Sequence, residues 1–365
     1  MIAKPSPSTT TTANRLPAAD PTPKRPLYEA STQFRNWRFS PEQLSNLRLT
    51  LNEAAVAVIR NTLENEKPGS SLDVSFLSAE EEHLLVKLYV TKIAQLCSLF
   101  RFPEEVEATA VTYLKRFYLK NTVMDWHPKN VMLTALFLAT KTTNNPISLE
   151  TYTTHIPKTA PSDVLDLEFL VAQSLGFEFA VWHSHRALWG MTLDMQTLPE
   201  CPADTRPIYE LALNHVRSSR LTDAELIYTP SQIALAALSL ATPELASQWS
   251  ASKTPSGPSP SGQSVEMLPG VTEAIKTLIT TAGHPPQVEA VREVDRRLKL
   301  CKNPEKIVGS HAYLAKKAEE ERVAEAKRNK KASEAQQAMA DGDPFGTELP
   351  KVPMGLVDYE DEDED

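Results

Sequence analysis

Apolar residues recur along this chain at the three- and four-residue spacing of amphipathic helices. Ser78 and Glu81 form the Ser-x-x-Glu signature that opens many helices. After them the apolar positions follow at spacings of four and three: Leu85, Tyr89, Ile93, Leu96 and Phe100. This pattern predicts a helix that begins directly after Ser78.

Proline marks the start of two further predicted helices. Pro103 stands at a first-turn position, and the helix after it has one apolar face at Val106, Ala110, Tyr113 and Phe117. Pro128 opens a third helix, which has no polar side from Val131 to Ala139, the pattern of a helix buried all round. We expect this helix to be the centre of a bundle. A short helix near Leu149 and a longer one from Pro161 to about Leu175 complete a five-helix unit.

An internal repeat extends this prediction to the whole folded region. Residues 127–141, HPKNVMLTALFLATK, and residues 229–243, TPSQIALAALSLATP, are identical at seven of fifteen positions, at an offset of 102 residues. The offset continues upstream without a gap, and a bias toward alanine and leucine would not preserve the proline that opens each segment. We therefore predict an all-α fold of two tandem five-helix bundles. Pro243 stands where the first copy has Lys141, so the copies differ in chemistry.

Composition sets the predicted domain edges. Residues 1–26 hold six of the 28 prolines among Ser, Thr and Ala, which is typical of a disordered arm. We predict a disordered arm at 1–39 with a docking segment at 28–39, an N-terminal helix at 40–66, a first bundle at 73–178, a second bundle at 179–285 with a mobile loop at 246–264, a C-terminal helix at 286–303, and a charged, mostly disordered tail at 304–365.

Charge and cysteine content exclude several classes of function. The net charge is −9, but the last eight residues hold seven acids and leave −2 for the rest, which argues against a broad nucleic-acid surface. The three cysteines include no CxxC pair, and the glycines never fall in GxGxxG or GxxxxGK. We find no signal peptide and no apolar run of membrane-spanning length. We expect a reduced, intracellular protein without metal, cofactor or membrane contact.

Four segments carry a resemblance to a known family: Ser31–Ser40, Lys115–Pro128, Phe137–Lys141 and Leu226–Leu235. In them the chain resembles the cyclins, whose fold is two tandem five-helix bundles, and within the cyclins it is most similar to the cyclin H group and its fungal members. The first, second and fourth segments look specific to cyclin H. The similarity runs from about Tyr28 to Asn303, roughly three quarters of the chain.

The resemblance implies a regulatory subunit that binds and activates a cyclin-dependent kinase and has no chemistry of its own. It implies the CDK-activating kinase module of TFIIH, with a RING-finger assembly factor as third subunit and indirect contact with the TFIIH core. It also implies a nuclear location, and as substrates the RNA polymerase II C-terminal domain and CDK activation loops. The first helix lacks the Met-Arg-Ala-Ile-Leu patch, so we expect no cell-cycle type of substrate docking.

Lys141 and Glu168 are the first candidate site residues. Glu168 falls on the apolar stripe of Val164, Val171 and Leu175, where an unpaired charge would cost several kcal/mol, and Lys141 at the end of the central helix is its natural partner. Alternatively, Glu168 is exposed and Lys141 only complements the helix dipole. The resemblance implies that both contact the kinase, although Thr142–Asn145 follow Lys141 where many cyclins have acids.

Three aromatic residues complete the predicted site region. Phe177 and Phe179 follow Gly176 at the end of the fifth helix, and the resemblance implies that they pack on the kinase. The alternative for both is a place in the core, which is the position we expect for Phe137.

Two alternatives remain open in the sequence. Within the family, the chain could be another transcriptional cyclin, of the cyclin C or cyclin K type, although Ser31–Ser40 and Lys115–Pro128 argue against it. Outside it, the DNA-binding general transcription factor TFIIB also has tandem cyclin-like bundles. The near-neutral body and the lack of a zinc-binding Cys/His ribbon argue against that class.

Overall fold

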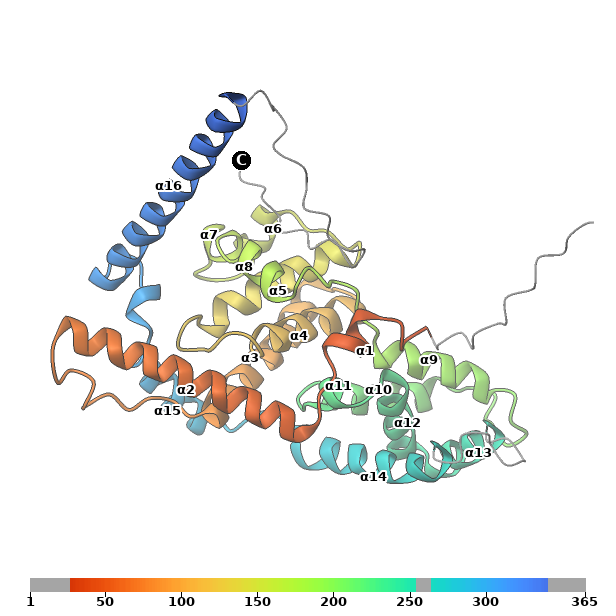
Figure 1. The fold of residues 1–365 in the computed structure, drawn as a ribbon. Helices are drawn as coiled ribbons and strands as arrows, with labels where there is room; N and C mark the ends of the chain where they lie inside the picture. Colours follow the sequence, from red (N-terminus) through yellow and green to blue (C-terminus); the bar gives the residue numbers. More distant parts are fainter. Residues whose placement is uncertain (1–26, 254–263, 341–365) are drawn as a thin grey trace, which may run out of the picture. The chain divides into compact units, whose positions relative to one another are not determined.

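The computed structural model describes residues 27–253 and 264–340, and within these ranges all regular structure is helical (Figure 1). This confirms the predicted all-α class. In chain order the helices are α1 Thr32–Asn36, α2 Pro41–Glu66, α3 Ala79–Phe100, α4 Glu104–Phe117, α5 Pro128–Thr142, α6 Leu149–Thr154, α7 Ser162–Leu165, α8 Glu168–Ser174, α9 Ser184–Met195, α10 Arg206–Ser219, α11 Ala224–Ile227, α12 Pro230–Ala241, α13 Pro243–Lys253, α14 Ser264–Ala282, α15 Val288–Leu298, the 3₁₀ helix η1 Pro304–Lys306, and α16 His311–Ala340.

The chain divides into two compact units. Unit one consists of Met1–Leu44, Val90–Phe117 and Met132–Pro285, and unit two of Ser45–Tyr89, Tyr118–Val131 and Pro286–Asp365. Unit one therefore contains α4, most of α5 and all helices of the second repeat. Unit two contains most of α2, the first half of α3, and α15.

The internal repeat is visible in the helix boundaries. Helices α4 and α10 start 102 residues apart and have the same length of 14 residues, and α5 and α12 start at the same offset. The predicted cap of α12 is present, because Thr229 Oγ1 accepts from Gln232 N (3.3 Å) while the Gln232 side chain accepts from Thr229 N (2.9 Å). In α5 the predicted all-round burial is confirmed at Val131, Met132, Leu133, Ala135, Leu136, Phe137, Leu138 and Ala139.

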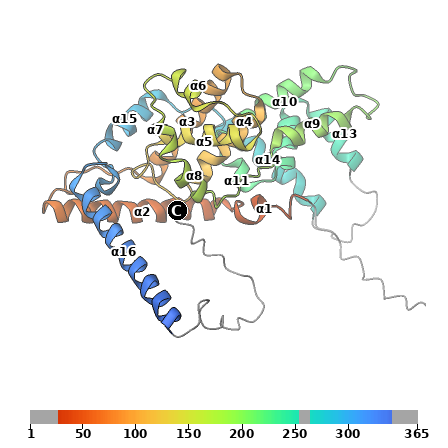
Figure 2. The same ribbon diagram turned by 90° about the horizontal axis from the view of Figure 1, so that it is seen from above.

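In unit one, α12 is the central helix of the second repeat. It contacts α9, α10, α13 and α14, which lie around it in Figure 1, and Figure 2 shows the same four helices grouped together from above. Its buried residues include Ile233 and Leu238, and the core beside it is completed by Leu188, Met195 and Val216. An apolar helix surrounded in this way needs no polar face, which explains its uniform sequence.

In unit two, the flanking helices α2 and α15 are tied to the start of α3. Glu82 of α3 accepts hydrogen bonds from Asn52 Nδ2 of α2 (2.5 Å) and from the backbone N of Val123 (2.7 Å). Burial raises the pKa of Glu82 to about 6, although the two hydrogen bonds to its carboxylate act to lower that pKa. Arg297 of α15 forms an ion pair with Glu81 at the same helix start. The buried residues of α15 are Val291, Val294 and Leu298.

The structure differs from the predicted elements at two places. The single helix expected from Pro161 to Leu175 is two helices, α7 and α8, because the backbone turns at Leu167 (φ −103°, ψ −2°) and Thr134 Oγ1 donates to the Val164 carbonyl (2.9 Å). The loop expected at 246–264 starts later, because residues up to Lys253 continue α13 and Ala246 is buried in the second-repeat core. The rest of that loop, 254–263, lies outside the described residues.

Helix α3 has the predicted extent but is more apolar than expected, since no apolar run of membrane-spanning length was predicted. By length and composition it could cross a membrane, with a mean hydropathy of 1.2 over its most apolar 18-residue window. Core helices of soluble proteins meet the same criterion. In this fold α3 contributes Leu85, Ile93 and Cys97 to buried positions.

The structure also differs from the prediction at 304–365, because the 30-residue helix α16 lies in a segment that was expected to be charged and mostly disordered. Its first turns are anchored, since Lys316 pairs with Glu305 (2.7 Å) and Ser310 Oγ accepts from Tyr313 N (3.0 Å). Nearly every residue described from 317 on is exposed, as expected for a helix solvated on all sides.

Candidate functional site

The structure brings Lys141 and Glu168 together as an ion pair. Lys141 lies in the last turn of α5 and Glu168 is the first residue of α8, so each charge also complements the dipole of its own helix. Lys141 Nζ lies 4.9 Å from the centre of the Phe137 ring. The two side chains remain partly accessible, at 41% and 25% of their full exposure, so the pair is on the surface.

Aromatic side chains continue this surface from α8 into the turn that follows it. Phe169 and Phe177 have ring centres 6.2 Å apart, and Phe177 and Phe179 have ring centres 6.3 Å apart. Phe179 is half-buried against Tyr113 (6.1 Å), whose hydroxyl donates to the Phe179 carbonyl (2.7 Å). Phe177 is 53% exposed and Phe169 is 69% exposed. The core alternative therefore fails for Phe177, while Phe137 is buried as expected.

The turn itself has an uncommon backbone. Gly176 and Phe177 both adopt the left-handed conformation, with φ of +61° and +57°. The Phe177 N–H donates to the Ala172 carbonyl (3.0 Å) and the Gly176 N–H to Gln173 (2.9 Å), so the turn closes the C-terminus of α8. This geometry projects the Phe177 ring outward.

Two exposed apolar residues of α7 and α8, Leu165 and Phe169, were not predicted from the sequence. Leu165 is 45% exposed, and both are large apolar residues in a segment rich in buried positions. The sequence does contain a pattern that indicates their exposure, because neither residue falls on the stripe of Val164, Val171 and Leu175, whose members are fully buried. Apolar residues off the buried stripe of an amphipathic segment face outward, where they are free to bind a partner. The surface formed by Lys141, Glu168, Phe169, Phe177 and Phe179 is called the α5–α8 surface below.

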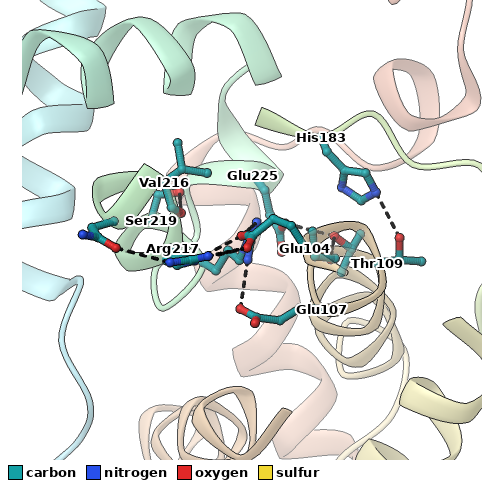
Figure 3. Close-up of polar contacts among 12 residues, drawn as sticks. Glu104, Glu107, Thr109, His183, Val216, Arg217, Ser219 and Glu225 are labelled. Carbon is teal, nitrogen blue, oxygen red and sulfur yellow. Dashed lines mark hydrogen bonds and ion pairs between the residues drawn. The ribbon is translucent and has the colours of Figure 1, made fainter. Parts of the chain in front are cut away.

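A second cluster of polar contacts joins α4 to α10 and α11 within unit one (Figure 3). Arg220 is nearly buried and pairs with Glu104 (2.7 Å) and Glu107 (2.9 Å), and Arg217 also pairs with Glu104 (2.7 Å). Burial opposes ionisation of Glu104, but the Arg217 hydrogen bonds and the charge of Arg220 outweigh it and lower its pKa. Lys115 pairs with Glu225 (2.9 Å). These contacts fix the two repeats to each other and expose no reactive group.

No constellation for catalysis or metal binding emerges in the part of the chain that the structure describes. There, no three His, Cys, Asp or Glu side chains are placed to hold a metal ion. Asp163, which could be mistaken for a catalytic acid, lies in the first turn of α7 and accepts a hydrogen bond from the Ala160 backbone (2.8 Å). What the described site offers is an apolar, partly charged surface on a rigid helical body.

These features define a class, a helical protein of two tandem repeats that exposes aromatic side chains beside a surface ion pair. Residues 59–180 match the family model for the cyclin N-terminal domain, and residues 183–280 match the model for the cyclin C-terminal domain. The chain belongs to the cyclin family.

Its relatives include members of the cyclin H group. Cyclin mcs2 of Schizosaccharomyces pombe is 32% identical over 326 residues, covering 87% of this chain and 98% of that protein. Cyclin-H of Xenopus laevis is 30% identical over 308 residues, covering 81% and 93%. Among solved structures, a chain of the CAK complex from Chaetomium thermophilum bound to ATP-gamma-S superposes with a TM-score of 0.71 at 29% identity, covering 80% of this chain and 94% of that chain. The predicted resemblance to cyclin H is confirmed.

Proposed function

We propose that this chain is the cyclin subunit of a CDK-activating kinase, a regulatory protein that binds a cyclin-dependent kinase and performs no chemistry itself. The observation that carries the proposal is the α5–α8 surface, where exposed Phe169 and Phe177 adjoin the Lys141–Glu168 pair. Exposed aromatics beside a charged pair are the composition of an interface hot spot rather than of an ordinary soluble surface. The similarity to cyclin H proteins and to a chain of a CAK complex supports the same conclusion.

The mechanism of activation is conformational. A protein kinase is active only when the lysine of its third strand pairs with the glutamate of its αC helix, which depends on where that helix lies. A rigid surface that packs against the αC helix holds it in the active position. The contacts of Lys141 with the Phe137 ring and with the Glu168 carboxylate support a preformed surface of this kind.

The proposal extends to the assembly and its location. We expect a RING-finger assembly factor as third subunit, contact with the TFIIH core only through the assembly, and action in the nucleus on the RNA polymerase II C-terminal domain and on CDK activation loops. The near-neutral charge outside the acidic C-terminus supports the expectation that the chain does not bind nucleic acid directly.

The experiment is to replace Lys141 and Glu168 by alanine, singly and together, in the full chain. The kinase is the one that copurifies with the wild-type chain from its own cells. Each single variant should weaken kinase binding by about 2 kcal/mol or more, because the remaining charge is left unpaired when the complex desolvates it. The double variant should lose less than the sum of the two singles. Dissociation constants, stimulated phosphorylation and melting temperature are measured for all three.

A second lysine–glutamate pair serves as the matched control. Lys276 and Glu273 form an ion pair on α14 (2.8 Å), away from the α5–α8 surface in sequence and element. Their alanine variants should bind and activate the kinase normally. Wild-type affinity in all the Lys141 and Glu168 variants would remove that pair from the interface, and a large loss of melting temperature with intact activation would make it a structural pair.

A further inference from the structure

Glu178, between the two aromatic residues Phe177 and Phe179, is held by the N-terminal segment of the chain. Its carboxylate accepts one hydrogen bond from Asn36 Nδ2 (2.5 Å, to Oε1) and one from Trp37 Nε1 (2.5 Å, to Oε2). Each carboxylate oxygen therefore has its own donor, supplied from about 140 residues upstream in the sequence. Hydrogen bonds to an ionised acceptor are stronger than those between neutral groups.

Arg116 contacts both Trp37 and Glu178. Its guanidinium lies 4.8 Å from the Trp37 ring centre and donates from Nη1 to the Glu178 carbonyl oxygen (3.3 Å). Only 1% of Arg116 is exposed. Burial lowers the pKa of Arg116 to about 10, so the side chain is still charged at neutral pH. Asn36 and Trp37 thus fix the side chain of Glu178, and Arg116 fixes its backbone carbonyl.

The turn directly before Glu178 has an unfavourable backbone conformation. Phe177 adopts a φ of +57°, a conformation that bulky residues avoid and that persists only where the surroundings impose it. The next residue, Glu178, is the one with side-chain bonds to Asn36 and Trp37. Losing those bonds would release the turn at the point where its backbone is least favourable.

We propose that Asn36 and Trp37 are positioning residues for kinase binding, which act by clamping Glu178 and so presenting Phe177 and Phe179 in a preformed arrangement. The inference rests on the proposed function, because it assigns a role to residues that support the α5–α8 surface. Asn36 and Trp37, in the N-terminal segment Tyr28–Phe39, then raise the affinity for the kinase without contacting the kinase themselves. Preformed surfaces bind more tightly because less conformational freedom is lost on association.

Other contacts hold the segment in place independently of this clamp. Gln33 and Trp182 exchange two hydrogen bonds (3.2 and 2.7 Å), and the Tyr28 ring packs edge-on against Trp182 (5.9 Å). Phe39 N donates to the Leu226 carbonyl (2.8 Å). Removing the clamp should therefore free the turn while the N-terminal segment stays attached.

The test uses Asn36→Ala and Glu178→Gln in the full chain, with Arg35→Ala, at the exposed neighbouring position of α1, as the matched control. Asn36 is exposed, so its replacement removes one donor without opening a cavity. Glu178→Gln leaves one acceptor oxygen for two donors. Both variants should keep the melting temperature within a few degrees of wild type and bind the kinase about tenfold more weakly, as when the binding-competent state falls to about a tenth of the population. The loss should appear mainly as slower association, and activity of the saturated complex should be unchanged.

A double-mutant cycle separates positioning from direct contact. In a chain that already carries Phe177→Ala and Phe179→Ala, Glu178→Gln should cause no further loss of affinity, because there is no aromatic turn left to position. Equal losses in both backgrounds would overturn the proposal, as would wild-type affinity for Asn36→Ala and Glu178→Gln. Arg35→Ala should bind normally, and a tenfold loss there would overturn the proposal by showing that any change in α1 suffices. If the Phe177 and Phe179 replacements themselves leave binding intact, it is the proposed interface that fails.

Discussion

His183 and His185 lie with their rings stacked, 5.1 Å apart, at the start of α9. Residues two apart do not share a helix face, so their spacing alone indicated separate surroundings. His183, however, is the residue before the helix and has extended backbone angles (φ −108°, ψ 140°). Both rings are buried, and His183 Nε2 lies 3.0 Å from Thr109 Oγ1. The cap conformation brings together two side chains that a helix would separate.

These histidines make stability depend on pH. Burial lowers the pKa of His185 from 6.5 to about 4, with Arg220 adding to the effect and Glu104 opposing it. Burial, the neighbouring His185 and nearby arginines also lower the pKa of His183. Because the unfolded chain binds protons below pH 6.5 while the folded chain excludes them, this contribution is complete above pH 6.5 and is lost as the pH falls toward 4.

The prediction concerns His185→Phe, which cannot titrate. Between pH 7 and pH 5 the wild-type contribution of His185 falls by about 2 kcal/mol. The variant should therefore lose less unfolding free energy than wild type over this interval, measured by denaturant unfolding at both values. The Glu82 contribution, whose raised pKa of about 6 gives the opposite slope, is common to both proteins and cancels in the comparison. Identical pH dependence in the two proteins would contradict the prediction.

At the scale of elements, α4 and α10 occupy equivalent positions in the two repeats and are joined by charged side chains. Arg220, just after α10, is 7% exposed and reaches both Glu104 and Glu107 of α4. Arg217, one turn earlier, is 45% exposed and reaches Glu104 alone. The Glu104 carboxylate thus pairs with one buried arginine, Arg220, and one exposed arginine, Arg217.

This difference predicts unequal effects of the same substitution. Arg220→Met should lower the unfolding free energy by about 3 kcal/mol, because the poorly solvated Glu107 loses its arginine partner and Glu104 loses the buried one of its two. Arg217→Met should cost less than about 1 kcal/mol, as exposed ion pairs do. Denaturant unfolding of both variants at pH 7 checks the prediction. Equal losses would mean that burial does not decide the strength of this contact.

At the scale of the molecule, we propose that the stable body runs from about Tyr28 to about Lys317. Residues 1–26 are rich in proline and poor in large apolar residues, and α16 is almost wholly exposed where it is described beyond Lys317. Deleting residues 1–26 and 318–365 should leave cooperative unfolding and a melting temperature within a few degrees of the full chain, since little packing is removed. Kinase binding should persist, because the α5–α8 surface lies inside the retained body. A broad, non-cooperative transition would show that the body extends further.

The amino-acid sequence by itself determined the helical class, the tandem repeat and the central helices. It did so because these features are local and periodic: a cap such as Thr229 and Gln232 lies within one turn, and the uniform apolar run of α5 needs no knowledge of its neighbours. The pairing of Lys141 with Glu168 was only one of two alternatives that the sequence left open, and the structure shows the pair with both side chains partly exposed.

Only the tertiary structure decided the details that make the surface specific. The break between α7 and α8, the left-handed backbone of Phe177, and the bonds from Asn36 and Trp37 to Glu178 have no periodic signature. Each depends on single contacts between residues far apart in the chain, and such contacts form only when the whole bundle brings those residues together. Propensity and periodicity describe a residue's neighbours along the chain, whereas these features depend on its neighbours in space.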